Sequence, residues 1–427
     1  MISFVPSSLR PLAQHAAQDL TRRTGRRVLL ALLSVVLFSV SFAAITYYDL
    51  QSQVEIIDVA TMVGTDRPSR ADGEQGVDDS YEGRAVNILV MGSDTRAGSN
   101  NVDGSEGSED VAVARSDTAM IMHLSADRSR IEVVSIPRDT LVDIPSCTLP
   151  DGSSTDPQYD TMFNSAFATG AGESTAPEAV AAGAACTIKT VEQMTGIFID
   201  EYMVVDFAGL STMVDALGGV RVYVDEEIDD PDYTGLVLEP GCYLMGGSTA
   251  VSYARVRHGV GGDASDLNRI GRQQNLMAAM LRTAQQKNLL TSATDLYSFA
   301  RSALATLTTS PGIGSLPTLA GLAQSIAAIG MDNVRFVTMP YMAAPSDENR
   351  VVPSGEAQAV WDALINDTPV PDESVTVQGD GSTPTPTDGT GTGEEGTGSP
   401  EQPGQPEDPG AMTPTEDPVA ACYDLTK

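Results

Sequence analysis

The fold is decided by the stretch A-V-N-I-L-V-M-G, Ala85–Gly92. A short apolar run that ends in glycine predicts a buried β-strand leading into a loop. Two more strands are predicted after it, at Thr118–Ser125 and Arg130–Ile136, with a tight turn at Asp127–Ser129 between them. Because helix and strand patterns alternate in the rest of the domain, we expect a three-layer α/β/α arrangement around a central mixed sheet.

The later elements are predicted from apolar periodicity and from glycine and proline punctuation. The predicted strands are Glu201–Phe207, Val220–Val224 and Val334–Met339. The predicted helices are Pro177–Met194, Ala208–Leu217, Leu267–Leu281, Leu289–Ala328 with breaks at Pro311 and Pro317, and Gly355–Ile365. Gly196 is expected to end the first of these helices. Pro150–Gly172 and Glu239–Gly247 are interpreted as loop and turn segments.

The N-terminal region has the pattern of a membrane anchor. Residues 1–27 are Arg-rich, and residues 28–48 carry no charge over a length that can cross a bilayer. The arginines predict a cytoplasmic N-terminus, a single pass through the cell membrane and an extracellular C-terminal domain. A cleaved signal peptide is the alternative, because Ser41-Phe42-Ala43 resembles a cleavage site, but the long basic segment favours an uncleaved anchor.

The remaining segments follow from composition. Residues 49–84 are polar and acidic and are interpreted as an extracellular stalk, and residues 85–378 as the folded domain. Residues 379–419 are rich in Gly, Pro, Thr and Glu and are expected to be disordered, and residues 420–427 form a tail with Cys422. The net charge of −33 argues against nucleic-acid binding.

Four cysteines fit an oxidising compartment and two disulfides. Four cysteines allow three connectivities, which sequence alone does not distinguish. We favour Cys147–Cys186 and Cys242–Cys422, because the first two cysteines bracket one Gly/Ala-rich segment.

The stretch Tyr253–Gln274 is the candidate active centre. It concentrates arginine, whose planar guanidinium group matches phosphate oxygens two at a time, and an aspartate at an expected helix N-cap. Its residues of interest are Arg255, Arg257, Asp266, Arg269, Arg272 and Gln273. An extended segment would point Arg255 and Arg257 to the same side. A clamp for a diphosphate is one interpretation, and a solvated helix face is the other.

Two acids and a further arginine stand beside predicted strand ends. Asp94 and Asp117 lie in loops beside strands, where two carboxylates can hold one Mg²⁺ ion, and Arg138 follows a strand at the edge where α/β sites collect. The alternative is that both aspartates only cap turns. The chain contains no nucleophile elbow, H-E-x-x-H motif or Walker loop.

The ordered motifs resemble those of the LytR-CpsA-Psr family of cell-wall glycopolymer ligases. The matching stretches are N-I-L-V-M-G-S-D at Asn87–Asp94, R-S-D-T at Arg115–Thr118, S-I-P-R-D-T at Ser135–Thr140, F-N-S-A-F at Phe163–Phe167, D-x-L-G-G-V at Asp215–Val220, and Y-A-R-V-R-H at Tyr253–His258 with D-L-N-R-I-G-R-Q-Q at Asp266–Gln274. The resemblance covers roughly residues 85–285 and continues more weakly to about Ile365. The cysteines and the long tail resemble features of actinobacterial members.

The resemblance implies a phosphotransferase. Such enzymes bind a polyprenyl-diphosphate-linked glycan, with the lipid in an apolar pocket, and transfer the glycan phosphate to an acceptor hydroxyl, usually on peptidoglycan. Asp94 and Asp117 would hold Mg²⁺ or Mn²⁺. The diphosphate would contact Arg138, Arg255, Arg257, Arg269, Arg272 and Gln273. The catalytic residues would be Arg138, Arg257 and Asp266, with Asp266 orienting the arginines or taking the acceptor proton.

Several functional alternatives stay open from the sequence. The acceptor can be a surface protein rather than peptidoglycan, as in some actinobacterial relatives. The chain can also be a membrane-anchored binding or regulatory protein without turnover. Hydrolysis of the diphosphate, with water as the acceptor, is a further possibility.

Overall fold

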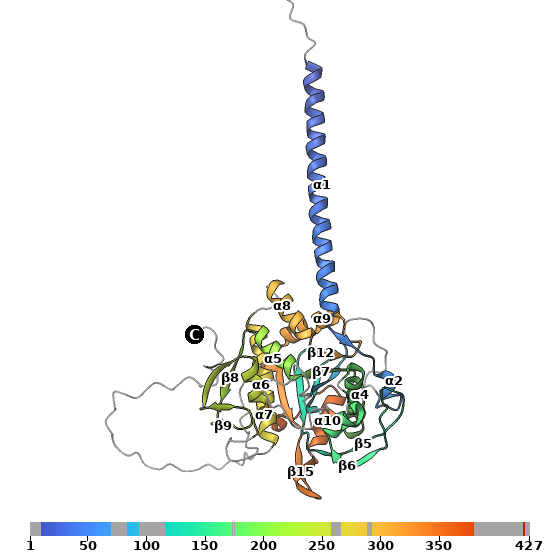
Figure 1. Cartoon of the computed structure of the whole chain (residues 1–427), viewed down its shortest axis with the longest axis vertical. Coiled ribbons are helices and arrows are strands. Elements are labelled where there is room, and N and C mark those ends of the chain that lie inside the picture. Colours follow the sequence, from blue (N-terminus) through green and yellow to red (C-terminus); the bar gives the residue numbers. More distant parts are fainter. Residues whose placement is uncertain are drawn as a thin grey trace, which may run out of the picture. The chain divides into compact units, whose positions relative to one another are not determined.

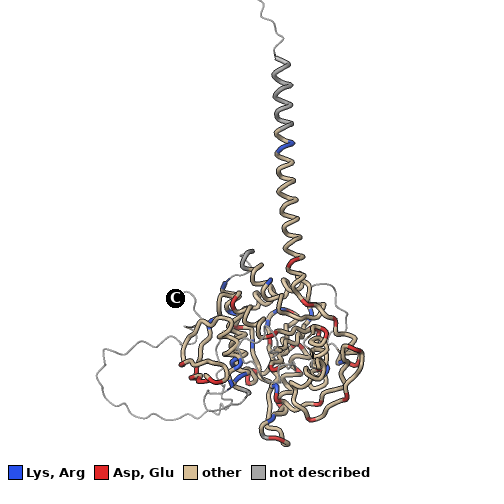
Figure 2. The backbone as a smooth tube through the Cα atoms, in the orientation of Figure 1, with Lys and Arg blue, Asp and Glu red and all other residues tan. Residues whose placement is uncertain are grey.

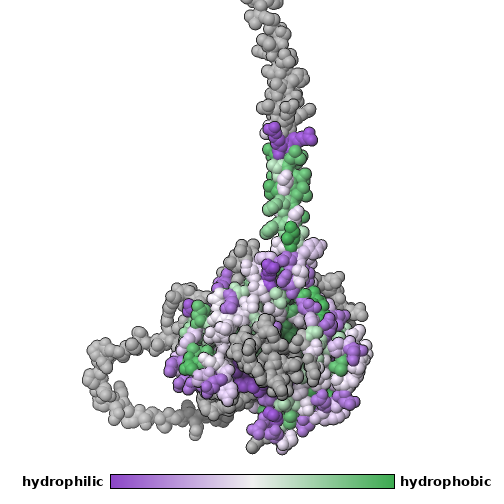
Figure 3. Space-filling model, viewed as in Figure 1, coloured by the Kyte–Doolittle hydropathy of each residue, from purple (hydrophilic) through white to green (hydrophobic). Residues whose placement is uncertain are grey.

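The computed structural model describes residues 10–69, 83–93, 116–172, 174, 176–257, 266–287, 293–379 and 422. The chain divides into two compact units, Met1–Ser52 and Gln53–Lys427. The first unit is helix α1, Arg10–Gln51. Its part Thr24–Gln51 is long and apolar enough to cross a membrane, and Figure 3 shows its apolar band next to hydrophilic side chains. The predicted span of residues 28–48 lies inside this helix.

The second unit is built on an eight-stranded mixed sheet with the order β1-β12-β7-β2-β3-β4-β13-β16. Its strands are β1 Glu55–Ile56, β2 Val86–Ser93, β3 Ser116–Leu124, β4 Ile131–Ile136, β7 Glu201–Asp206, β12 Leu307–Thr309, β13 Val334–Thr338 and β16 Val375–Gln378. β2 is antiparallel to β3 and parallel to β7, and β4 is parallel to β13. The predicted central mixed sheet is confirmed.

Helices cover both faces of this sheet, as the three-layer prediction requires (Figure 1). They are α2 Ala60–Val63, α3 Ser165–Ala171, α4 Pro177–Thr195, α5 Phe207–Ala216, α6 Gly247–Arg255, α7 Asp266–Gln286, α8 Ala293–Leu304, α9 Leu316–Ile329 and α10 Ala357–Ile365. Leu89 of β2 packs in a core with α3, α4 and α10, whereas the next residue on the other side, Ile88, packs with α7 and α9. Strand alternation therefore feeds two separate apolar layers.

The described residues also form two-stranded sheets outside the main sheet. They pair β5 Leu141–Ile144 with β6 Gln158–Met162, β8 Val220–Val224 with β11 Gly241–Met245, β9 Ile228–Asp230 with β10 Leu236–Leu238, and β14 Tyr341–Ala344 with β15 Asp347–Pro353. β6 and α3 form where a loop was predicted, because Phe163 and Phe167 are buried and fix that segment against α4. β11 likewise replaces a predicted turn, and β12 was not predicted.

The interpretation of residues 49–84 as a stalk is wrong for its first half. Glu55 and Ile56 form β1, which pairs in parallel with β12 of the main sheet. Val59 and Val63 are buried in the core beside α4. Within residues 49–69, Val54, Val59 and Val63 are buried, and the overall polarity of the stretch concealed this apolar pattern.

The favoured disulfide pairing is confirmed. Cys147 is bonded to Cys186, and Cys242 to Cys422. Gly196 ends α4 with a left-handed backbone, φ 74°, as expected for a helix-stop glycine. The segment interpreted as disordered lies outside the described residues, apart from Gly379.

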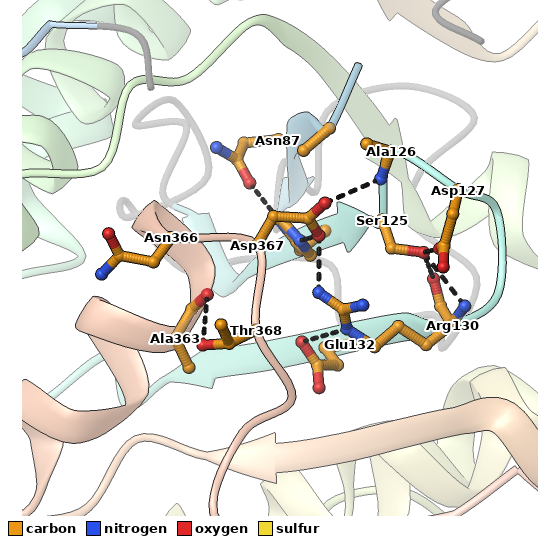
Figure 4. Close-up of polar contacts among 12 residues, drawn as sticks. Asn87, Ser125, Ala126, Asp127, Arg130, Glu132, Ala363, Asn366, Asp367 and Thr368 are labelled. Atoms are coloured by element: carbon orange, nitrogen blue, oxygen red, sulfur yellow. Dashed lines mark hydrogen bonds and ion pairs between the residues drawn. The ribbon is translucent and has the colours of Figure 1, made fainter. Parts of the chain in front are cut away.

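A partly buried polar network lies beside the end of β3 and the start of β4 (Figure 4). The Asp367 carboxylate accepts a hydrogen bond from the Ala126 amide at 3.0 Å and pairs with Arg130 at 2.5 Å. It also lies 3.1 Å from Nε2 of His123, whose Nδ1 lies 2.7 Å from Oδ1 of Asn87. These contacts fasten the segment after α10 to β2, β3 and β4.

Candidate functional site

Asp117 occupies an irregular position at the start of β3. Gly92 pairs with Thr118, whereas Ser93 pairs with Ser116. Asp117 is therefore the extra residue of a β-bulge, an irregularity that re-aims a side chain. A Cβ atom at Gly92 would lie only 3.1 Å from the Thr118 Cβ, so glycine permits this close strand approach. The bulge gives Asp117 a direction that simple strand alternation does not predict.

Three arginines from separate parts of the chain meet at Asp117. Arg138 Nη1 donates to Oδ1 at 3.2 Å, and Arg257 Nη2 donates to Oδ2 at 3.0 Å. Arg269 Nη2 donates to the Asp117 backbone carbonyl at 3.2 Å, and its Nη1 lies 3.6 Å from Oδ2. We call these four residues the Asp117 cluster. It joins β3, the end of β4, the end of α6 and the start of α7.

Burial within the Asp117 cluster is graded. The side chain of Arg269 is 3% exposed and that of Asp117 is 11% exposed, whereas Arg257 is 36% exposed. Three guanidinium groups and one carboxylate leave a net charge of +2 among these four residues. A partly buried excess of positive charge attracts an anion, and guanidinium groups suit phosphate oxygens.

Topology explains why Arg138 reaches Asp117. β3 and β4 are antiparallel, with Ala119 opposite Ile136. The start of β3 therefore adjoins the end of β4, and Arg138 comes two residues after that end. The backbone N–H of Asn164 donates to the Arg138 carbonyl at 3.1 Å and stabilises the backbone at Arg138.

Gln274 anchors α7 to the sheet and was missed as a site-building residue. Its fully buried amide donates to Ser135 Oγ at 2.9 Å and lies 3.3 Å from Thr338 Oγ1. Its Oε1 accepts from Thr376 Oγ1 at 2.8 Å. One side chain thus connects α7 to β4, β13 and β16. The available signal was a polar residue on the core-facing stripe that includes Ile270 and Met277.

Arg272 and Gln273 contact the end of α6 instead of Asp117. Arg272 Nη2 donates to the Val256 carbonyl, and Gln273 Nε2 lies 3.4 Å from the Ala254 carbonyl. Burial lowers the pKa of the Arg272 guanidinium, and nearby acidic groups partly offset that effect. In this structure both side chains stabilise the backbone at the end of α6, directly before Arg257.

Arg255 makes a different contact from Arg257. Its guanidinium carbon lies 4.9 Å from the centre of the Phe207 ring, a cation–π arrangement. The expectation of an extended segment at Arg255–Arg257 is wrong, because α6 continues through Arg255 and ends only at Val256, with φ −53° and ψ 130°.

The remaining predicted site residues are only partly described. Asp94 lies outside the described residues. Asp266 is the first residue of α7, but its side chain is not described. Asp117 has the ligand type that Mg²⁺ prefers, yet in this structure three guanidinium groups point at it. Within the described ranges, no cluster of three His, Cys, Asp or Glu side chains is placed to hold a metal.

An incompletely covered apolar strip lies on the α7 face of the sheet. Val90, Met122 and Met203 are on adjacent central strands yet remain partly accessible. Met277 and Leu281 pack against the same core from α7, about two and three turns beyond Arg269. α7 therefore connects the Asp117 cluster to an apolar surface. Figure 2 shows that acidic residues gather instead near β9.

Two of the relatives that the chain resembles are named for cell-wall synthesis or teichoic acid transfer. The chain is 30% identical over 282 residues to the cell wall biosynthesis protein LcpA of Corynebacterium glutamicum, covering 63% of this chain and 52% of that protein. It is also 30% identical over 229 residues to the polyisoprenyl-teichoic acid–peptidoglycan teichoic acid transferase TagU of Halalkalibacterium halodurans, covering 53% and 62%. The match spans about half to three-fifths of these relatives.

Solved structures share the fold. The LytR-Csp2A-Psr enzyme of Actinomyces oris has a TM-score of 0.50 at 19% identity, covering 73% of this chain and 95% of that chain. The protein gbs0355 of Streptococcus agalactiae has a TM-score of 0.52 at 20% identity, covering 67% and 90%. The LytR_cpsA_psr family model matches residues 46–366. Because that match takes in the whole main sheet except β16, together with the Asp117 cluster, the chain belongs to the LytR_cpsA_psr family.

Proposed function

We propose that this chain is an extracytoplasmic phosphotransferase that moves a glycan phosphate from a polyprenyl-diphosphate-linked glycopolymer to a hydroxyl group of peptidoglycan. The Asp117 cluster is the observation that carries the proposal, since it holds more positive than negative charge in a partly buried place. The names of the relatives LcpA and TagU support the class of substrate.

The arginines suit the electrostatic demands of this reaction. The acceptor oxygen forms a new bond to phosphorus while the bridging P–O bond of the diphosphate breaks. Polyprenyl phosphate leaves with the electron pair, and the acceptor hydroxyl loses its proton. Charge grows on the leaving phosphate, where preplaced guanidinium groups stabilise it. Arg138, Arg257 and Arg269 would supply these groups, and Asp266 is proposed as the proton acceptor.

The lipid part of the donor requires an apolar surface beside the charged one. Val90, Met122 and Met203 on β2, β3 and β7 form such a partly accessible apolar surface. Helix α7, which carries Arg269, packs against the same core. An anchored protein would meet a lipid-linked donor at the membrane, and α1 contains a span long enough for anchoring.

Mg²⁺ or Mn²⁺ remains a prediction, with Asp94 and Asp117 as its ligands. A bound divalent ion would neutralise charge on the diphosphate. Titration of the full chain with Mg²⁺, read out by the thermal unfolding midpoint, tests this prediction independently of turnover. An unchanged midpoint in the wild type and in Asp117→Asn would contradict it.

The decisive test is release of polyprenyl phosphate by the full chain in detergent. The assay contains a polyprenyl-diphosphate glycan, peptidoglycan and Mg²⁺. Arg138→Ala and Arg257→Ala should each lower release at least a hundredfold, roughly the loss of one transition-state donor. Arg335→Gln is the control, because Arg335 lies on β13 opposite Glu132, near the start of β4, and pairs with Asp372, whereas Arg138 follows the end of β4.

The acceptor is identified by leaving out one candidate acceptor at a time from the release assay. Release that requires peptidoglycan supports the proposal. Release that requires a surface protein instead supports protein glycosylation by the same chemistry, and release with water alone indicates hydrolysis. Tight donor binding without product under every condition would reject the enzyme in favour of a binding or regulatory role.

A further inference from the structure

A second arginine–aspartate pair adjoins the Asp117 cluster. Arg138 Nε lies 3.6 Å from Asp139 Oδ2, and Arg350 Nη1 lies 3.5 Å from Asp139 Oδ1. Asp139 therefore stands between two guanidinium groups that are far apart in the sequence. Arg350 comes from β15, in the hairpin that projects from the domain in Figure 1.

Backbone contacts hold this hairpin beside the site. Thr140 forms an isolated parallel bridge with Val351, and the Val351 amide lies 3.5 Å from the Asp139 carbonyl. Arg350 is 32% exposed, and its Nε also lies 4.0 Å from Asp347, so its guanidinium is shared between two acids. The β14–β15 hairpin is thus held by backbone contacts against the segment that directly follows Arg138.

Electrostatics indicates what this arrangement does. By itself, the negative charge of Asp139 would weaken the attraction of Arg138 for an anion, because an adjacent carboxylate offsets the charge of a guanidinium group. With Arg350 on its other oxygen, Asp139 is already balanced. Solvent screens the charge of Asp347, which is 45% exposed, and the other six residues, arginines 138, 257, 269 and 350 with aspartates 117 and 139, retain a net charge of +2.

We propose that Arg350 is a positioning residue that neutralises Asp139 and thereby keeps the positive charge of Arg138 available to the diphosphate. The inference rests on the proposed function, and it makes the β14–β15 hairpin a working part of that site. Arg350 acts through Asp139 and Arg138, so its loss affects diphosphate binding before it affects the chemical step.

Calorimetric titration of the full chain in detergent with inorganic pyrophosphate at fixed Mg²⁺ tests this. Arg350→Gln removes one positive charge and should weaken binding roughly three- to tenfold. Arg350→Lys keeps the charge and should stay within about twofold of the wild type. Adding Asp139→Asn to Arg350→Gln restores the net charge of +2 and should recover most of the affinity.

Arg335→Gln is the matched control, because Arg335 has the same 32% exposure and also pairs with an aspartate, Asp372. In the donor assay, Arg350→Gln should raise KM with little change in kcat. A merely structural role for Arg350 predicts no recovery in the double variant, and that result overturns the inference. Equal affinity of Arg350→Gln and the wild type also overturns it. If the wild type does not bind pyrophosphate, the proposed function itself fails.

Discussion

Arg257 Nη2 lies 3.0 Å from Asp117 Oδ2, although 140 residues separate the two along the chain. The contact depends on the bulge that turns Asp117 and on α6, which delivers Arg257 to the same edge of the sheet. Asp117 is the common partner of three arginines, so it both stabilises the cluster and occupies the place where an anionic ligand would compete.

Asp117→Asn should therefore destabilise the protein and make it respond more strongly to anions. Removal of the carboxylate leaves three guanidinium groups in mutual repulsion, at a cost of about 1–3 kcal/mol. Without Mg²⁺, the thermal unfolding midpoint should fall, and pyrophosphate should raise it more in Asp117→Asn than in the wild type, since no carboxylate then competes with the anion. Asp372→Asn is the control, since Asp372 is 81% exposed. Equal shifts with pyrophosphate would count against the anion site.

Gln274→Leu should detach α7 from the sheet. Leucine has a similar volume but leaves the Ser135, Thr338 and Thr376 hydroxyl groups without their amide partner. We expect a loss of about 2–4 kcal/mol in unfolding free energy. Donor turnover should fall as well, because α7 carries Arg269.

Gln285→Leu is the control on the same helix, because Gln285 makes a single 3.4 Å contact to the Ile326 carbonyl near the other end of α7. Urea unfolding of both variants measures the difference. Similar losses in the two would mean that the Gln274 network has no special role.

The layers of the fold were predictable because short apolar runs indicate strands buried on both faces, and 3.6-period patterns indicate helices with one apolar face. β2, β3, β4, β7 and β13 follow that rule and were predicted close to their observed bounds. β1 and β12 are only two and three residues long. Such short strands exist because neighbours in the sheet hold them, and their own sequence carries almost no period.

The candidate site was predictable in residue type but only partly in geometry. A concentration of arginine and a nearby aspartate are visible in sequence. Which arginines contact Asp117 depends on the bulge, on the antiparallel pairing of β3 with β4, and on the way in which Gln274 seats α7. Arg255, Arg272 and Gln273 share the motif with Arg257 and Arg269, yet they make other contacts here. Arg350 lay far from any motif and depended entirely on tertiary structure.

Stability should depend on pH through Asp367. Desolvation raises the pKa of this carboxyl, but hydrogen bonds from His123 and Ala126 and the charge of Arg130 outweigh it, and the net pKa is lowered. A lowered folded pKa contributes stability that is complete above the unfolded value of about 3.9 and is lost as pH falls through the folded value.

Asp367→Asn is the variant that isolates this group, because asparagine tolerates the positive φ of 51° at this position. Its unfolding midpoint should lie below that of the wild type at about pH 5–7, and the gap should narrow below about pH 4. Thermal unfolding across this range measures the gap. A constant gap at all pH values would show that the contribution of Asp367 does not come from its charge.

The two disulfides should stabilise the domain by restricting its unfolded state. Cys147–Cys186 spans 39 residues, for which chain entropy gives about 4 kcal/mol, and strain or residual structure usually reduces that value. We expect Cys147→Ser with Cys186→Ser to cost about 2–4 kcal/mol in unfolding free energy. Cys242–Cys422 spans 180 residues and provides the comparison.

The two disulfides differ in their surroundings. Cys147 and Cys186 lie inside the core with α3 and α4, whereas Cys242 is exposed on β11. Loss of the first pair should therefore also loosen core packing. Urea unfolding of the two double-serine variants tests this prediction. An equal change in both variants in the slope of unfolding free energy against urea concentration would contradict a special role of the first pair in core packing.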